Sequence, residues 1–143
     1  MKVKDIMSTK PHYISPQTTL QEAAIKMSEW GLGSLPIGEN DKLIGMLTDR
    51  DITIRGVAKG KNPSTTPVKD VMTMKVLYCY ENDDVNKVSD SMCGEKIRRL
   101  IVLNDNKRFT GFISLGDIAA KTHDHDLTGH ILEIVAGAVK KAA

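Results

Sequence analysis

One short pattern, Gly-x-x-Thr/Ser-x-x-Asp, brings together the residue types that a sugar–phosphate ligand requires. It occurs twice in the chain, as Gly45, Thr48 and Asp51 and again as Gly111, Ser114 and Asp117. An ionised carboxylate accepts hydrogen bonds at both oxygens, which suits two vicinal ribose hydroxyls, and a Thr or Ser hydroxyl can donate to ribose or phosphate. The glycine permits close approach of a second backbone segment. The pattern therefore indicates a nucleoside site at a strand-to-helix junction, where free N–H groups favour anions.

Helix capping is the alternative explanation of the same residues. Thr48 or Asp49, and Ser114 or Asp117, are good N-cap residues without any ligand. A single occurrence of the pattern would favour capping. Its repetition in matching surroundings favours the binding site.

The basic residues near the two patterns differ. Arg50 lies inside the first pattern, whereas Arg98 and Arg99 precede the second. Guanidinium groups suit phosphate oxygens, although solvent-exposed arginines are the alternative. Lys10 and His12 are weaker candidates for the first site.

Other chemistry has less support. The repeat places no Ser/His/Asp or Cys/His set, so we expect no catalytic site. His123, His125 and His130 lie among aspartates in a stretch typical of a solvated loop, and we expect no metal there. Cys79 and Cys93 are expected to be reduced thiols.

A repeat of the whole sequence positions the two patterns. Residues 3–8 return as residues 68–73 at an offset of 65, and the two motifs are related by an offset of 66. The helix residues Leu20, Ala23 and Met27 likewise fall on Val85, Val88 and Met92. Two copies predict one compact body with a pseudo-twofold axis.

Each copy is predicted to fold as β-α-β-β-α after a short helical turn, which gives a mixed α+β class. The expected strands are residues 12–14, 35–37 and 43–47 in the first copy, and 77–80, 100–103 and 109–113 in the second. Thr19 and Glu22 form a capping box for the first amphipathic helix, which Gly31 and Gly33 end, and Asp83 or Asp84 caps the second, which ends near Gly94. The expected domains are residues 1–60 and 68–122, with a linker at 61–67 and a tail at 123–143.

The tail is expected to hold a polar loop, residues 123–128, and a helix with an apolar stripe. The stripe comprises Leu127, Ile131, Ile134, Val135 and Ala138. It must be buried, either against a second subunit or against its own chain, and we expect a homodimer in either case.

Length and composition limit the remaining classes. The 143 residues carry 41% hydrophobic residues and a net charge of +2, which fits a globular domain without nucleic acid as its main partner. No signal-peptide core and no membrane-length apolar stretch is present, so a cytoplasmic location without membrane association is expected.

With these features, the chain resembles a tandem pair of cystathionine-β-synthase (CBS) domains, a Bateman module. The resemblance rests on the opening Val-Lys-Asp-(Ile/Val)-Met-(Ser/Thr), the strand after the helix and the Gly-x-x-Thr/Ser-x-x-Asp ending. It covers residues 3 to about 121. The segment GMLTDRDITIRGVAKG further resembles stand-alone bacterial and archaeal CBS-pair proteins of the hypoxic-response type.

This resemblance implies two clefts for adenosyl ligands, namely AMP, ADP, ATP or S-adenosylmethionine. It assigns ribose to Thr48 and Asp51 in one cleft and to Ser114 and Asp117 in the other. The adenine pockets would comprise Tyr13, Ile14, Pro36 and Ile37, and Tyr78, Cys79, Ile101 and Val102.

The resemblance also implies a function without catalysis. The first hypothesis is an adenine-nucleotide sensor that acts on an unidentified partner protein and has no obligatory cofactor. The second is a constitutive dimeric module with empty clefts. An enzyme acting on nucleotides is the third and weakest.

Overall fold

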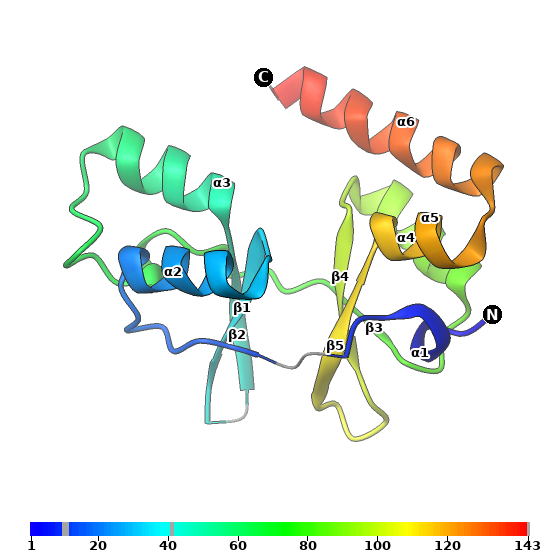
Figure 1. Cartoon of the computed structure of the whole chain (residues 1–143), viewed down its shortest axis with the longest axis horizontal. Helices are drawn as coiled ribbons and strands as arrows, with labels where there is room; N and C mark the ends of the chain where they lie inside the picture. The colour runs from blue at the N-terminus through cyan, green and yellow to red at the C-terminus, as the bar shows by residue number, and fades with distance from the viewer. Residues whose placement is uncertain (10–11, 41, 143) are drawn as a thin grey trace. The chain divides into compact units, whose positions relative to one another are not determined.

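The computed structural model describes residues 1–9, 12–40 and 42–142, with side chains up to residue 137 (Figure 1). Its elements, in chain order, are α1 (Val3–Ile6), α2 (Leu20–Trp30), β1 (Ser34–Glu39), β2 (Lys42–Thr48), α3 (Asp49–Asp51), η1 (Ile52–Gly56), η2 (Val57–Lys59), η3 (Val68–Asp70), β3 (Tyr78–Tyr80), α4 (Val85–Glu95), β4 (Arg99–Leu103), β5 (Phe109–Ser114), α5 (Leu115–Thr122) and α6 (His125–Ala142). The predicted mixture of helices and strands in two repeated units is confirmed.

Local signals set the ends of most elements. The Thr19 hydroxyl accepts from the Glu22 N–H at 3.2 Å, and Glu22 returns a bond to the Thr19 N–H, so the predicted capping box of α2 is confirmed. Gly31 ends that helix in the left-handed conformation, with φ of 65°. Asp84 caps α4 through the Asn86 N–H. Lys96, rather than Gly94, takes the left-handed position that ends α4.

Both predicted hairpins are present. β1 pairs with β2, and β4 pairs with β5, each in antiparallel register. β3 adds a parallel strand beside β4. The predicted strand at residues 12–14 is reduced to one parallel bridge between Ile14 and Ile37.

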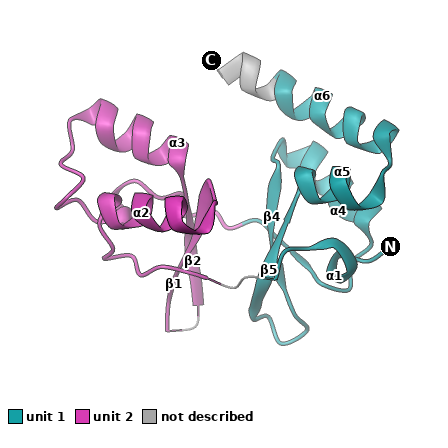
Figure 2. Ribbon diagram, viewed as in Figure 1, with its two compact units in different colours: residues 1–11, 77–143 teal, residues 12–76 magenta. Residues whose placement is uncertain are grey.

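The two compact units do not follow the two copies of the sequence. Unit 1 contains Met1–Pro11 and Leu77–Ala143, whereas unit 2 contains His12–Val76 (Figure 2). Each unit therefore takes its helical opening segment, residues 3–8 or 68–73, from the other copy. Backbone pairing fixes the exchange: Ser8 bonds Phe112 of β5 in both directions, at 2.8 and 2.9 Å, and Thr73 bonds Met46 of β2 at 2.8 and 2.9 Å.

A separate hydrophobic core stabilises each unit. In unit 2, Leu20 and Ala23 of α2 pack with Leu35 and Ile37 of β1 and with Val68 of the opening segment. The core of unit 1 repeats this arrangement with its own opening segment. It contains Val3, Ile6, Val85, Val88, Met92, Leu100, Val102, Ile113, Leu115 and Ile118.

The C-terminal helix α6 completes unit 1. Ile131 and Val135 are 0% and 2% exposed in its core, Leu127 packs against the same core, and α6 contacts both α4 and α5. These three residues of the stripe are therefore covered by their own chain, which removes them as an argument for a dimer. Ile134 is half-buried, and the Ala138 side chain lies outside the described residues. The predicted loop at residues 123–128 is also wrong, because Asp124 caps the helix through the Leu127 N–H and α6 begins at His125.

Candidate functional site

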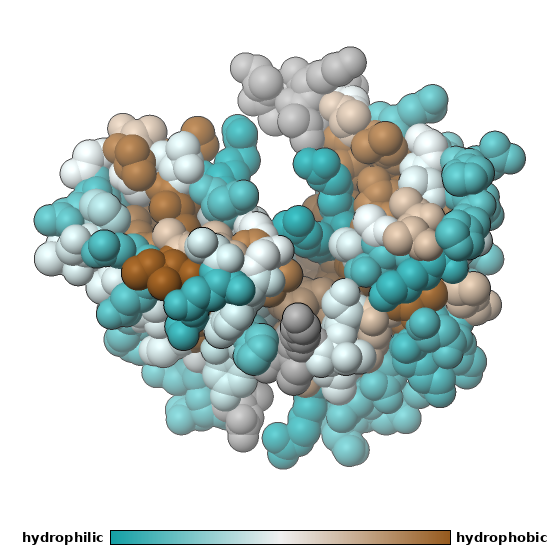
Figure 3. Space-filling view, in the orientation of Figure 1, coloured by the Kyte–Doolittle hydropathy of each residue, from teal (hydrophilic) through white to brown (hydrophobic). Residues whose placement is uncertain are grey.

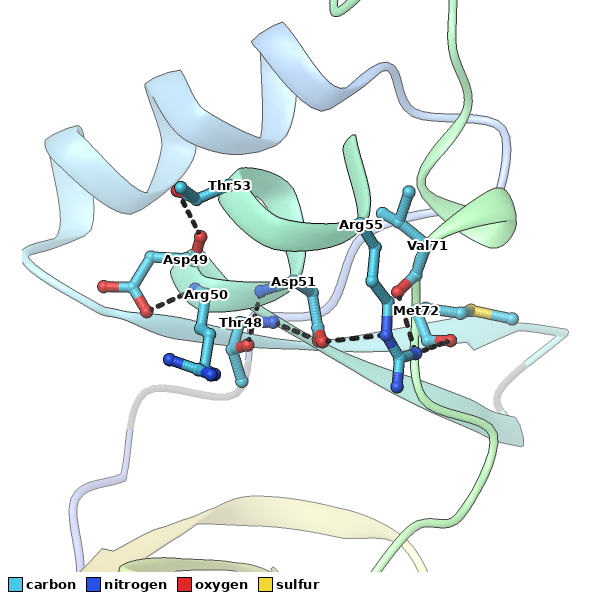
Figure 4. Close-up of polar contacts among 8 residues, drawn as sticks. All are labelled: Thr48, Asp49, Arg50, Asp51, Thr53, Arg55, Val71 and Met72. Carbon is cyan, nitrogen blue, oxygen red and sulfur yellow. Dashed lines mark hydrogen bonds and ion pairs between the residues drawn. The ribbon is translucent and has the colours of Figure 1, made fainter. Parts of the chain in front are cut away.

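The first motif occupies the junction between β2 and α3. The Thr48 N–H donates to Asp51 Oδ2 at 3.0 Å, and the Asp51 N–H donates to the Thr48 hydroxyl at 3.0 Å (Figure 4). This reciprocal pair is a capping box, so the capping explanation is correct as a description of the motif's structural role. The hydroxyl hydrogen of Thr48 and the second carboxylate oxygen of Asp51 are not used by the box, which leaves them to contact a ligand.

The second motif repeats this geometry between β5 and α5. The Ser114 N–H donates to Asp117 Oδ2 at 2.9 Å, and the Asp117 N–H donates to the Ser114 hydroxyl at 3.0 Å. Two further contacts distinguish it, because the Ser114 hydroxyl lies 2.9 Å from Oδ2 and the Ser8 hydroxyl donates to Oδ1 at 3.3 Å. The Asp117 carboxylate therefore has less acceptor capacity to spare than the Asp51 carboxylate.

The motif glycines accommodate the exchanged opening segments. A Cβ on Gly45 would lie 2.8 Å from the Thr73 carbonyl oxygen, and a Cβ on Gly111 would overlap the Ser8 carbonyl oxygen. The prediction that these glycines allow a backbone to approach closely is confirmed. The approaching backbone is the opening segment of the other copy.

Two cations next to the motif carboxylates were missed in the sequence. Arg55 Nε lies 3.8 Å from Asp51 Oδ1, and Lys121 Nζ lies 3.7 Å from Asp117 Oδ1. Each cation follows its aspartate by four residues, which places both side chains on one helix face. The signal was present, because the offset of 66 that relates the motifs also relates Arg55 to Lys121.

The strand residues assigned to the adenine pockets divide between two faces. Ile14, Ile37 and Val102 are buried in the cores, as is Cys79, so their side chains cannot cover a ligand. Successive side chains of a strand point to opposite faces, and the expectation that adjacent residues share one pocket ignored this alternation.

The other face of each strand carries the remaining pocket candidates. Tyr13 and Tyr78 occupy equivalent positions and are 44% and 52% exposed. The Tyr13 ring lies against Gly38, where a Cβ would be 2.7 Å from it. Tyr78 is beside Ile101 in the parallel register, as Tyr13 is near Pro36, and Ile101 is also paired with Phe112. Pro36 and Ile101 are themselves buried, with Ile101 only 1% exposed, so the two tyrosine rings are the pocket candidates left to contact an adenine ring.

The arginines that were expected to contact phosphate lie on different elements near the two motifs. Arg50 is exposed in the first turn after Thr48, and in the view of Figure 4 its guanidinium extends to the same side of the turn as the Thr48 side chain. Arg99 pairs with Ser114 across β4 and β5, and the Arg98 carbonyl accepts from the Leu115 N–H at 2.9 Å. The backbones of Arg98 and Arg99 therefore lie at the end of β4 that is next to the second motif.

The two weaker candidates for the first site have different outcomes. The His12 ring stacks on Trp30 with 4.4 Å between ring centroids, so α2 already engages it. Lys10 lies outside the described residues.

The environments of the two cysteine thiols favour their protonated, less reactive form. Burial raises the pKa of the Cys79 thiol to about 12, and the nearby Asp83 carboxylate adds to the rise. Burial also raises the pKa of the Cys93 thiol. The described residues contain no group of three or more His, Cys, Asp or Glu side chains placed to hold a metal ion, and no described helix is long and apolar enough to cross a membrane.

Comparison with known proteins identifies the family. The CBS domain model matches residues 3–55 and 68–124. The CBS domain-containing protein YhcV of Bacillus subtilis is 37% identical over 130 residues, which cover 91% of each chain. Hypoxic response protein 1 of Mycobacterium tuberculosis is 33% identical over 132 residues, which cover 92% of each chain.

Solved structures agree with this assignment. A structure of Hypoxic Response Protein I with two coordinated zinc ions matches with a TM-score of 0.75 and 34% identity, over 85% of this chain and 98% of that one. The CBS domain pair of protein MJ0100, in complex with 5′-methylthioadenosine and S-adenosyl-L-methionine, matches with a TM-score of 0.74 and 27% identity, over 84% and 98% of the two chains. The chain belongs to the CBS-domain family and carries two CBS domains.

Proposed function

We propose that the protein is a non-catalytic regulatory module that binds adenosyl ligands and signals their presence to a partner protein. The observation that carries this proposal is the duplicated carboxylate. Asp51 and Asp117 have side chains that are only 13% and 16% exposed, and each keeps one oxygen in a capping box while the other faces a cation. The MJ0100 pair, bound to two adenosyl compounds, supports this class of ligand.

The ligand would use both sides of each junction. Ribose hydroxyls would donate to the Asp51 or Asp117 carboxylate, and the adenine ring would contact the exposed Tyr13 or Tyr78. We propose AMP, ADP or ATP as the regulatory ligand, with S-adenosylmethionine as the next candidate. A cytoplasmic location suits both nucleotides and the two free cysteines.

Replacement of either motif aspartate by asparagine is expected to weaken binding about ten- to a hundredfold at one site. The amide keeps an acceptor for the capping N–H but removes a charged hydrogen bond of roughly 1.5–3 kcal/mol. Titration calorimetry with AMP and S-adenosylmethionine measures the change in Asp51→Asn and Asp117→Asn.

Glu22→Gln is the matched control, because Glu22 closes the same kind of capping box on α2 outside the motifs. It should change stability as much as the motif variants and leave affinity unchanged. Equal affinities in all three variants and the original chain would remove the ribose role. A preceding thermal-shift panel selects the ligand, since a ligand at 100 times its dissociation constant stabilises by about 2.7 kcal/mol.

The arginines are expected to make the protein prefer AMP to adenosine. Each guanidinium can donate two hydrogen bonds to phosphate oxygens, so Arg50→Gln should reduce the preference in unit 2 and Arg98→Gln in unit 1. Added salt should weaken AMP binding more than adenosine binding. Equal binding of the two ligands, unchanged by either substitution, would assign these arginines to the solvated surface.

A constitutive dimeric module is the second candidate function. Ile25 of α2, Ile54 of η1 and Val57 of η2 are 48%, 46% and 60% exposed in unit 2. Figure 3 shows apolar side chains gathered over these elements. We propose that a homodimer covers them, because a twofold contact would bury the same apolar residues of both subunits. A mass of 15.7 kDa by light scattering at micromolar concentration would exclude the dimer. Ile54→Glu should dissociate it, whereas the exposed Met74→Glu should not.

A further inference from the structure

Arg55 and Lys121 each contact both a motif carboxylate and backbone carbonyls of an opening segment or its end. In unit 2, Arg55 Nη1 donates to the carbonyl oxygens of Val71 and Met72 at 3.3 and 3.4 Å, while its Nε faces Asp51 at 3.8 Å (Figure 4). In unit 1, Lys121 Nζ donates to the Ile6 carbonyl oxygen at 2.7 Å while facing Asp117. Two different side chains thus make the same bridge from a motif carboxylate to an exchanged opening segment.

The bridge is a consequence of the exchange. Backbone pairing with Met46 and Phe112 holds the opening segments beside β2 and β5, and the motif glycines let them approach. The carbonyls at the end of each short opening helix have no further helical turn to bond with. A cation four residues after the motif aspartate lies within reach of both groups.

We propose that Arg55 and Lys121 are positioning residues that couple each motif carboxylate to the opening segment of the other copy, so that ligand binding at the carboxylate is reported on that segment. This inference rests on the proposed ribose role of Asp51 and Asp117. The capping box already uses Oδ2, so a ribose hydroxyl that binds Oδ1 shares that oxygen with the cation. Sharing weakens the ion pair and changes the bonds between the cation and the segment carbonyls.

The two bridges differ in one respect. In unit 1 the Ser8 hydroxyl also donates to Asp117 Oδ1, at 3.3 Å, which gives the opening segment a second connection to the carboxylate. The structure gives the equivalent Thr73 hydroxyl no such bond among the described residues. Loss of Arg55 should therefore uncouple unit 2 more completely than loss of Lys121 uncouples unit 1.

Removal of either cation should leave the chain folded. The Arg55 and Lys121 side chains are 53% and 44% exposed, and ion pairs of such exposure contribute only about 0.2–1 kcal/mol. The variants Arg55→Met and Lys121→Met retain an unbranched apolar stem and remove the charge. Arg55→Lys and Lys121→Arg keep the charge and serve as conservative controls.

Amide hydrogen exchange on the full chain tests the coupling, with AMP and S-adenosylmethionine as the probes. The reporters are the Thr73 amide, bonded to Met46, and the Ser8 amide, bonded to Phe112. Ligand should change both exchange rates by about 1.4- to fivefold, the range that 0.2–1 kcal/mol implies. Arg55→Met should abolish the response at Thr73 alone, Lys121→Met should reduce it at Ser8 alone, and the charge-conserving variants should retain both.

The outcomes separate this inference from the function on which it rests. If neither probe binds the unaltered chain, the proposed function fails and the coupling fails with it. If a probe binds, but the reporters do not respond or respond alike in all four variants, the ligand site stands and the coupling is wrong. The crossed loss of response, restored by the conservative variants, is the result that supports it.

Discussion

Gly111→Ala is expected to destabilise the protein by about 3 kcal/mol, because the new methyl group has no room. Its Cβ would overlap the Ser8 carbonyl oxygen and lie 3.3 Å from the Thr9 Cα. Backbone atoms cannot rotate away as a side-chain end can, and overpacking of this kind costs roughly 1–3 kcal/mol. The two Ser8–Phe112 hydrogen bonds would weaken as well. Urea unfolding measures the loss.

Gly129→Ala provides the opposite control. Gly129 lies within α6, and a Cβ there meets nothing within 4 Å. Alanine should stabilise the helix by about 0.5–1 kcal/mol. Should Gly111→Ala prove as stable as the unaltered chain, the opening segment of the first copy would not lie against β5.

Ile131→Ala should cost about 2–5 kcal/mol of unfolding free energy. Ile131 is 0% exposed in the core of unit 1, and truncating a buried aliphatic side chain removes its burial and leaves a cavity. Leu132, its neighbour on α6, is 47% exposed, so Leu132→Ala should change stability by no more than about 0.5 kcal/mol. Thermal or urea unfolding of the two variants compares them directly.

This pair of variants also decides where α6 packs. If α6 packs on α4 and α5 of its own unit, the cost of Ile131→Ala is independent of protein concentration. A cost that grows on dilution would show instead that a second subunit covers the helix, since subunit association depends on concentration. Similar small costs for both variants would mean that α6 is not docked at all.

The sequence alone predicts features that depend on neighbouring residues. The Thr19–Glu22 capping box, the Gly31 helix end and both hairpins follow from side chains that act within a few positions of themselves. The repeat predicts the two motifs and their equivalent places at strand-to-helix junctions. The loop expected at residues 123–128 is a wrong prediction of this local kind, because Asp124 is also a good helix N-cap residue and was not recognised as one.

Which face of each strand packs in the core, and which is free to contact a ligand, became clear only from the structure. Ile14 and Ile37 are apolar, as the walls of an adenine pocket would be. Strand pairing places their side chains in the core, however, and leaves Tyr13 on the other face. Strand alternation is readable in principle. It becomes decisive only when the core that covers one face is known.

The partners of the motif residues were decided by tertiary structure. The sequence determined that Asp51 and Asp117 are equivalent, that each follows a glycine and a hydroxyl, and that a cation stands four residues beyond each. It did not determine that Arg55 would bond Val71 and Met72, or that Lys121 would bond Ile6, 115 residues away. Local rules act over a turn of helix or a hairpin, whereas these contacts depend on which copy's opening segment pairs with β2 and β5. Both copies open with nearly the same residues, so only the packing of the folded chain selects between them.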